Sequence, residues 1–128
     1  MIDAKELRKN NIVKFVKPVH INLGHINVKN NTVRLSTYGI HLIENDKKTK
    51  VNPIKLTDDW LVKGNIKLNL EFRIGRKGFI VSKAQDDDLV LLFSSDIGID
   101  YCMLCDLDFV HNFQNVIFAL TGEELTIK

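Results

Sequence analysis

The 128-residue sequence predicts an α+β fold in which antiparallel, mostly β-rich structure is completed by a short linking helix and a C-terminal helix packed on the sheet. Apolar residues recur at every second position over much of residues 12–42, which indicates short strands with one solvated face. A second β-rich region covers residues 66–104, and apolar residues at helical spacing follow it. We therefore expect a single domain, with a β-rich lobe at about residues 1–56 and an α+β lobe at about residues 57–128.

The N-terminal half favours a curled antiparallel sheet or a small barrel that resembles an SH3-type module. Its four or five short strands are joined by small turns, and the last of these strands contains Ile40 and Leu42. A polar, lysine-rich loop follows. Residues 51–54 then predict an edge strand, because Pro53 cannot donate a backbone hydrogen bond to a neighbouring strand.

The C-terminal half predicts fewer and longer strands. Residues 57–64 indicate a two-turn linking helix with Thr57 as its N-cap. The alternating run 66–72 predicts a strand, and residues 75–78 predict the tip of the hairpin that follows it. Residues 89–93 are nearly all apolar, which predicts a strand buried on both faces.

The strongest helix signal lies near the C-terminus. Val110, Phe113 and Ile117 recur at helical spacing and define a face that closes the core. Asp108 is placed to accept hydrogen bonds from the first free N–H groups as an N-cap. Gly122 is placed for a left-handed C-cap, where a residue with a Cβ is strained.

The composition is that of a globular protein. Hydrophobic residues make up 45% of the chain and charged residues 27%, which excludes global disorder. No apolar run approaches the roughly 18 residues needed to span a bilayer, and the charged start lacks a signal peptide. We expect a cytoplasmic protein without a membrane partner. Two cysteines do not make a disulfide framework.

The net charge of +2 hides an uneven distribution along the chain. Residues 1–83 hold 17 Lys and Arg against 7 Asp and Glu, a net charge of +10, whereas residues 84–128 hold 1 Lys against 9 Asp and Glu, a net charge of −8. The basic part can serve an anionic partner, or the two parts can face each other or a second copy of the chain. The charges can equally be spread over solvated faces.

Three segments carry a specific resemblance. Residues 4–13 read AKELRKNNIV, residues 53–61 read PIKLTDDWL, and residues 110–125 read VHNFQNVIFALTGEEL. In the same order, they resemble the ANELRIGNYV, PIPLTEEWL and VHQLQNLYFALTGEEL segments of a family of small uncharacterised proteins from Bacteroides-type bacteria and their phages. The resemblance covers roughly a quarter to a third of the chain. It implies a phage or mobile-element context and a cytoplasmic, non-catalytic protein, and it transfers no activity.

Basic residues form the candidate nucleic-acid surface. The hairpin tip at residues 75–78 can clamp phosphate through backbone N–H groups and cations, although it lacks the Gly-Lys-Ser/Thr ending of a P-loop and equally fits a solvated turn. Tyr38 is the main aromatic residue among these charges that can stack on a base. The candidate contacts to phosphate are Arg34, Lys47, Lys48, Lys50, Arg73, Arg76 and Lys77, together with Lys14 and Lys17.

Polar residues of the C-terminal region suggest further sites, each with a structural alternative. His111, Gln114 and Asn115 can form a partner surface, or they can tie the last helix to nearby loops. Asp106 and Asp108 with His111 can be read as metal ligands, but an N-cap and a loop residue explain the same carboxylates. We therefore expect no metal and no cofactor.

The pair Cys102 and Cys105 has C-x-x-C spacing within an apolar strand-like run. A zinc site needs about four ligands, and no second pair of cysteines exists. A redox motif belongs at a helix N-terminus, where the dipole lowers the thiol pKa. The sequence therefore favours buried structural thiols that point to opposite faces of the strand.

No pairing of a nucleophile with a base emerges from the sequence, so we expect no enzyme activity. The first functional hypothesis is a phage-related module that binds a protein partner or assembles with itself. The alternative is a nucleic-acid-binding module that uses the basic surface of residues 1–83.

Overall fold

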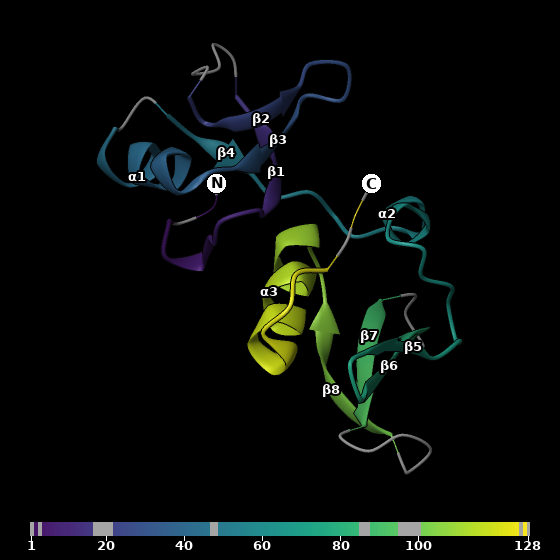
Figure 1. The fold of residues 1–128 in the computed structure, drawn as a ribbon. Helices are drawn as coiled ribbons and strands as arrows, with labels where there is room; N and C mark the ends of the chain where they lie inside the picture. The colour runs from purple at the N-terminus through teal and green to yellow at the C-terminus, as the bar shows by residue number, and fades with distance from the viewer. Residues whose placement is uncertain are drawn as a thin grey trace. The chain divides into compact units, whose positions relative to one another are not determined.

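The computed structural model describes residues 2, 4–16, 22–46, 49–84, 88–94, 101–125 and 127. It confirms the α+β class, with two antiparallel four-stranded sheets, three α-helices and one 3-10 helix in these ranges (Figure 1). The chain divides into two compact units, Met1–Ile54 and Lys55–Lys128, which we call the N-terminal unit and the C-terminal unit. Within the described ranges, every helix is too short or too polar to cross a membrane.

The N-terminal unit is built around one open sheet. Its strands follow the order β2-β3-β1-β4, so that β2 and β4 are the edges and the described strands do not close into a barrel. β4 is therefore an edge strand, as Pro53 predicts. The elements of this unit are η1 (Ala4–Glu6), β1 (Ile12–Phe15), β2 (Gly24–Asn27), β3 (Thr32–Leu35), α1 (Thr37–Asn45) and β4 (Val51–Asn52).

The core of the N-terminal unit lies on one face of this sheet. Its buried residues are joined by partly buried side chains of α1 and of the segment after η1, including Ile40, Ile43 and Leu7. The alternation of β1 and β3 sends every second side chain into this cluster. The buried members are Ile2, Val13, Phe15, Leu23, Val33, Leu35 and Val51.

One predicted strand of this unit is wrong, because Ile40 and Leu42 lie in helix α1. Ser36 caps the helix, and its side chain accepts a hydrogen bond from the Gly39 N–H at 2.9 Å. Ile40 and Ile43, three residues apart, both pack on the core. Two apolar residues at alternate positions fit a strand or a helix. The Ser36 cap favours the helix.

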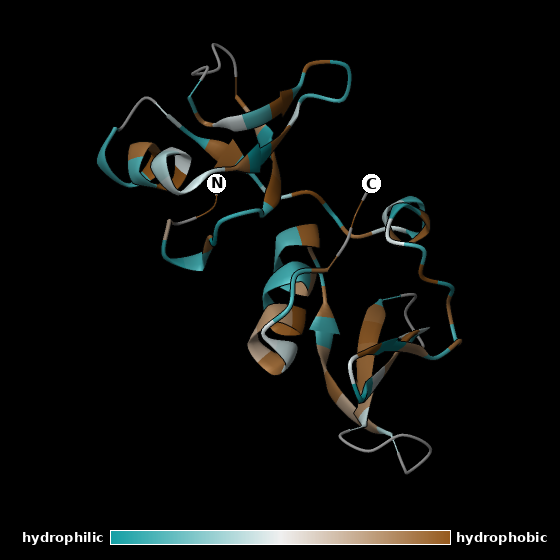
Figure 2. Ribbon diagram, in the orientation of Figure 1, coloured by the Kyte–Doolittle hydropathy of each residue, from teal (hydrophilic) through white to brown (hydrophobic). Residues whose placement is uncertain are grey.

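The C-terminal unit is organised around the central strands of the second sheet, whose order is β5-β6-β7-β8. β7 is brown along most of its length in Figure 2, and Leu89, Val90 and Leu91 are buried, as a strand covered on both faces requires. The elements are α2 (Asp58–Lys63), β5 (Phe72–Ile74), β6 (Lys77–Lys83), β7 (Leu89–Ser94), β8 (Cys102–Leu107) and α3 (Val110–Thr121).

The predicted strand at residues 66–72 is wrong over most of its length. β5 begins only at Phe72, and turns occupy the segment before it. Asn65 and Asn69 adopt positive φ angles of 58° and 63°, which a continuous strand does not allow. The predicted hairpin is confirmed: Ile74 pairs with Lys77 across a two-residue turn that begins with Gly75 at φ 62°.

Helix α3 confirms the predicted C-terminal helix but not its N-cap. Phe109 occupies the cap position without a side-chain cap bond, and the backbone carbonyl of Asp108 accepts a hydrogen bond from the Leu56 N–H at 3.0 Å. Gly122 ends the helix in the left-handed conformation at φ 71°, as predicted. Phe113 is buried and meets Phe72 edge to face, with ring centroids 6.3 Å apart.

Candidate functional site

The basic residues singled out from the sequence belong to both units. Arg34 lies on β3 and Lys50 just before β4, both in the N-terminal unit. The cations at residues 73, 76 and 77 belong to the β5–β6 hairpin of the C-terminal unit. Lys17, Lys47 and Lys48 lie outside the described residues. Each described candidate phosphate contact is therefore considered within its own unit.

The cations of the hairpin have different surroundings. Arg73 donates to Glu71 at 2.5 Å. Lys77 donates through Nζ to the backbone carbonyl of Leu120, one of the last carbonyls of α3, which lack a partner within the helix. Arg76 is exposed in the turn itself. Because Arg73 and Lys77 each donate to a partner within the protein, a phosphate clamp at this tip has fewer available cationic donors than its sequence suggests.

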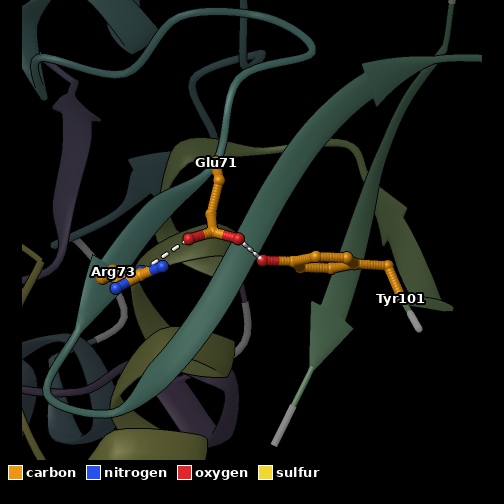
Figure 3. A network of polar contacts seen from close by, with 3 residues as sticks. All are labelled: Glu71, Arg73 and Tyr101. Atoms are coloured by element: carbon orange, nitrogen blue, oxygen red, sulfur yellow. Dashed lines mark hydrogen bonds and ion pairs between the residues drawn. The ribbon is translucent and has the colours of Figure 1, made fainter. Parts of the chain in front are cut away.

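Glu71 joins Arg73 to Tyr101 in the polar network of Figure 3. The Tyr101 hydroxyl donates to the second carboxylate oxygen of Glu71, and a Cβ on Gly78 would lie 2.4 Å from that hydroxyl. Glycine at this position therefore leaves room for the ring. Strands β5 and β8 lie at opposite edges of the sheet. The network links the segment that precedes β5 to the segment that precedes β8.

The protonation equilibria of this network follow from its hydrogen bonds. The hydrogen bonds from Tyr101 and Arg73 lower the pKa of Glu71 below that of a free carboxyl. Desolvation, together with the hydrogen bond to Glu71, raises the pKa of Tyr101 above that of a free phenol. Both shifts favour the pair in which Glu71 is ionised and Tyr101 is protonated, which is the arrangement of a structural tie.

The predicted partner surface on the last helix is only partly accessible. His111 is 2% exposed and Gln114 is 0% exposed, whereas Asn115 is half-buried. Asn112 lies beside His111, with its Nδ2 atom 3.4 Å from the ring Nε2 atom. The burial of His111 and Gln114 fits the alternative in which polar side chains of the helix bond within the protein.

The carboxylates considered as metal ligands do not converge. Asp106 and Asp108 are exposed, whereas His111 is buried. Across the described ranges, no three His, Cys, Asp or Glu side chains come close enough together to hold a metal ion. The backbone carbonyl of Asp108 accepts the hydrogen bond from Leu56, and its exposed side chain lies in no group of metal-ligating residues within these ranges.

The two thiols differ from the sequence expectation. Cys102 is exposed and Cys105 is half-buried, so that only Cys105 approaches the predicted environment. Burial, with a smaller contribution from Asp106, raises the pKa of the Cys105 thiol. The cysteines pair with Phe93 and Leu91, which are two apart on β7, so they share one face instead of pointing to opposite faces.

A β-bulge in β8 causes this change of face. Leu91 pairs with Cys105 and Leu92 pairs with Met103, which leaves Leu104 as the additional residue. The bulged segment is also apolar and exposed, because Met103 is 65% exposed and Leu104 is 41% exposed. This surface was not predicted, since an apolar run at the edge of a sheet has the same sequence pattern as one at its centre.

Surface depressions of the C-terminal unit contain charges of both signs. One of about 320 Å³ is lined by residues that include Lys55, Asp59 and the pair Lys83 and Asp58, whose Nζ and Oδ2 atoms are 3.5 Å apart. Another of about 440 Å³ is lined by Arg73, Glu123, Glu124 and uncharged residues of 64–66, 72–75 and 125. Neither concentrates charge of one sign in the way that an ionic substrate requires.

Comparison of the chain with protein families, with curated proteins and with solved structures gives no match. The resemblance to the Bacteroides and phage family therefore stays a prediction. The structural features that remain for a functional argument are the apolar edge at β8 and the polar face of the N-terminal sheet.

Proposed function

We propose that this protein is a non-catalytic assembly module of phage or mobile-element context that pairs with a second copy of itself along β8. The single observation that carries the proposal is the exposed apolar edge formed by Met103 and Leu104. A cytoplasmic location suits such a module and belongs to the same proposal. So does the SH3-like description of the N-terminal unit, which its short antiparallel strands support.

The four sheet edges differ in how well they are protected. β4 has two residues and is followed at once by Pro53, β5 has three residues, and β2 has four. β8 has six residues, and its exposed side chains are apolar at Met103 and Leu104. The bulge in β8 is one device that limits edge pairing, but the strand has no Lys or Pro, which commonly protect an edge. β8 is therefore the edge best suited to strand addition.

The charge pattern of β8 favours a second copy in antiparallel orientation. Asp106 is the charged residue of the strand and lies near its C-terminal end. A twofold axis near Met103 and Leu104 would keep the two Asp106 side chains apart and bring the apolar residues together. A parallel arrangement in register would instead place the two Asp106 carboxylates side by side. The antiparallel pair would extend the sheet across both copies.

Sedimentation velocity over a wide range of protein concentrations tests this proposal. The wild type should shift from monomer to dimer as concentration rises, and a double variant Met103→Lys with Leu104→Lys should remain monomeric, because four ammonium groups would meet at the axis. The matched control is Val62→Lys on α2, since Val62 is 73% exposed and belongs to the same unit. A wild type that stays monomeric throughout, or a control that dissociates equally, would refute the proposal.

A further inference from the structure

The sheet of the N-terminal unit has a second face, opposite its core. The strand register sets Val13 opposite Val33 and Val33 opposite Ile26, and these three side chains point toward the core. The residues between them in sequence point the other way. One row on this outer face contains His25, Arg34 and Ile12, and a second row contains Asn27, Thr32, Lys14 and Asn52.

This outer face is rich in hydrogen-bond donors and positive charge. Lys14, His25, Asn27 and Asn52 are exposed, whereas Arg34 is partly buried and Ile12 and Thr32 of the same rows are buried. The accessible part of this face is therefore the part that holds Lys14 and the two asparagines. The amides of the two asparagines and the charged groups of Lys14 and Arg34 can all donate to an anion. The strands lie about 4.8 Å apart, so the second row spreads its side chains across the full width of the sheet.

Carboxylates are absent from the strand residues that the structure describes on this face. Glu44 lies near the end of α1 and Asp46 at its C-cap, and α1 packs on the core face. Glu6 lies in η1, which contacts α1. The unit as a whole contains 10 Lys and Arg against 4 Asp and Glu, a net charge of +6. The positive potential of the outer face is therefore not cancelled by acidic neighbours on the same strands.

We infer that this face binds the phosphodiester backbone of a nucleic acid, with Lys14 and Arg34 as the cationic contacts and Asn27 and Asn52 as neutral donors. Contacts of this kind position a nucleic acid without reading its sequence. The inference goes beyond self-assembly through β8 and does not depend on it. In Figure 1, α1 lies beside the strands of this sheet, and its residues Ile40 and Ile43 pack against the core.

Fluorescence anisotropy with labelled single-stranded and double-stranded oligonucleotides of mixed sequence, titrated at several salt concentrations, tests the inference. The wild type should bind at low salt and weaken steeply as salt rises, because each phosphate contact releases a condensed counterion. Lys14→Gln combined with Arg34→Gln should weaken binding roughly tenfold and reduce the slope of log affinity against log salt by about 2. The two oligonucleotides decide which form of the backbone is preferred.

Two further variants keep the test decisive. Arg34 has additional interactions within the protein, so the exposed pair Lys14→Glu with Asn52→Asp provides a reversal of charge that leaves Arg34 in place. The matched control removes two exposed cations of the C-terminal unit, Lys67→Gln with Arg76→Gln, and should leave affinity and salt slope unchanged.

Absence of binding at low salt would overturn the inference, as would equal losses in the control. Retention on heparin without binding to either oligonucleotide would also overturn it, because heparin is a polyanion without a phosphodiester backbone. Far-UV circular dichroism of each variant establishes that a loss of binding does not come from unfolding.

Discussion

Alanine in place of Gly39 tests whether residues 37–45 form the helix α1 rather than the predicted strand. In an exposed helix, this substitution stabilises by about 1 kcal/mol, because glycine has the larger backbone entropy in the unfolded chain. Gly39 is buried, however, and a Cβ there would lie 1.8 Å from the backbone oxygen of Leu23. The same oxygen accepts hydrogen bonds from the Ser36 N–H at 3.2 Å and from the Ser36 hydroxyl at 3.3 Å.

The clash requires the backbone to move, because the atom in contact belongs to the main chain. Overpacking a buried position costs about 1–3 kcal/mol, and weakening the hydrogen bonds to Leu23 costs about 1 kcal/mol more. The gain in helix propensity offsets about 1 kcal/mol of this cost. Gly39→Ala should therefore destabilise the protein by about 1–3 kcal/mol.

Urea unfolding followed by far-UV circular dichroism measures this change. Trp60 fluorescence is unsuitable because Trp60 belongs to the C-terminal unit. Tyr38→Ala is the control, since Tyr38 is 54% exposed on the same helix and its loss should change stability by less than about 0.5 kcal/mol. Stabilisation by Gly39→Ala, as in an open helix, would refute the close approach of α1 to Leu23.

Three other predictions concern the C-terminal unit. Lys77→Met should destabilise the protein by about 1–2 kcal/mol in urea unfolding, because the carbonyl of Leu120 at the end of α3 loses its charged donor. Glu71→Gln should lower the stability of the protein near neutral pH, and the loss should be smaller at acidic and at alkaline pH. The lowered pKa of Glu71 gives stability that is lost as pH falls below about 4.5, and the raised pKa of Tyr101 gives stability that is lost as pH rises above about 10.0. A maleimide reagent should label Cys102 first, because its thiol is exposed.

Each of these predictions has a matched comparison. Arg76→Met removes a neighbouring exposed cation and should be close to neutral in the same unfolding assay. In an alkaline absorbance titration, Tyr101 should ionise above the range of a free phenol, and Glu71→Gln should reduce that shift without removing it, because desolvation is its largest cause. Burial raises the pKa of the Cys105 thiol, so maleimide should label it more slowly than Cys102. Equal labelling rates for the two cysteines would contradict the described environments.

Local signals predicted the elements that short-range chemistry controls. Gly122 predicted the left-handed end of the last helix, because glycine adopts positive φ without strain. Pro53 predicted an edge strand, because proline lacks a backbone N–H. The hairpin after β5 followed from Gly75 in the same way. These features need no knowledge of distant parts of the chain.

Other features depended on contacts that the sequence does not show. Asp108 has the residue type of an N-cap, but its backbone bonds to Leu56 and the helix begins later. The alternation over residues 66–72 was interrupted by positive φ at Asn69, whose N–H donates to the carbonyl of Val81 at 2.8 Å. Tertiary hydrogen bonds decided both cases over local propensity.

The candidate surfaces also depended partly on single residues and partly on contacts that the sequence does not show. The sequence analysis predicted Arg34 as a phosphate contact and grouped it with cations of the other unit, because charge counting ignores strand register. Only the register brings Lys14, His25 and Arg34 to one face. The exposed edge at Met103 was likewise hidden, because strand order decides which apolar strand lies at the border of a sheet.

Amide hydrogen exchange read by mass spectrometry, at low and at high protein concentration, tests the central proposal most directly. Pairing between two copies should slow exchange in β8, Cys102–Leu107, as concentration rises, while peptides from the N-terminal unit exchange at unchanged rates. The Met103→Lys and Leu104→Lys double variant should show no such dependence. Exchange in β8 that is the same at both concentrations would contradict assembly through this strand.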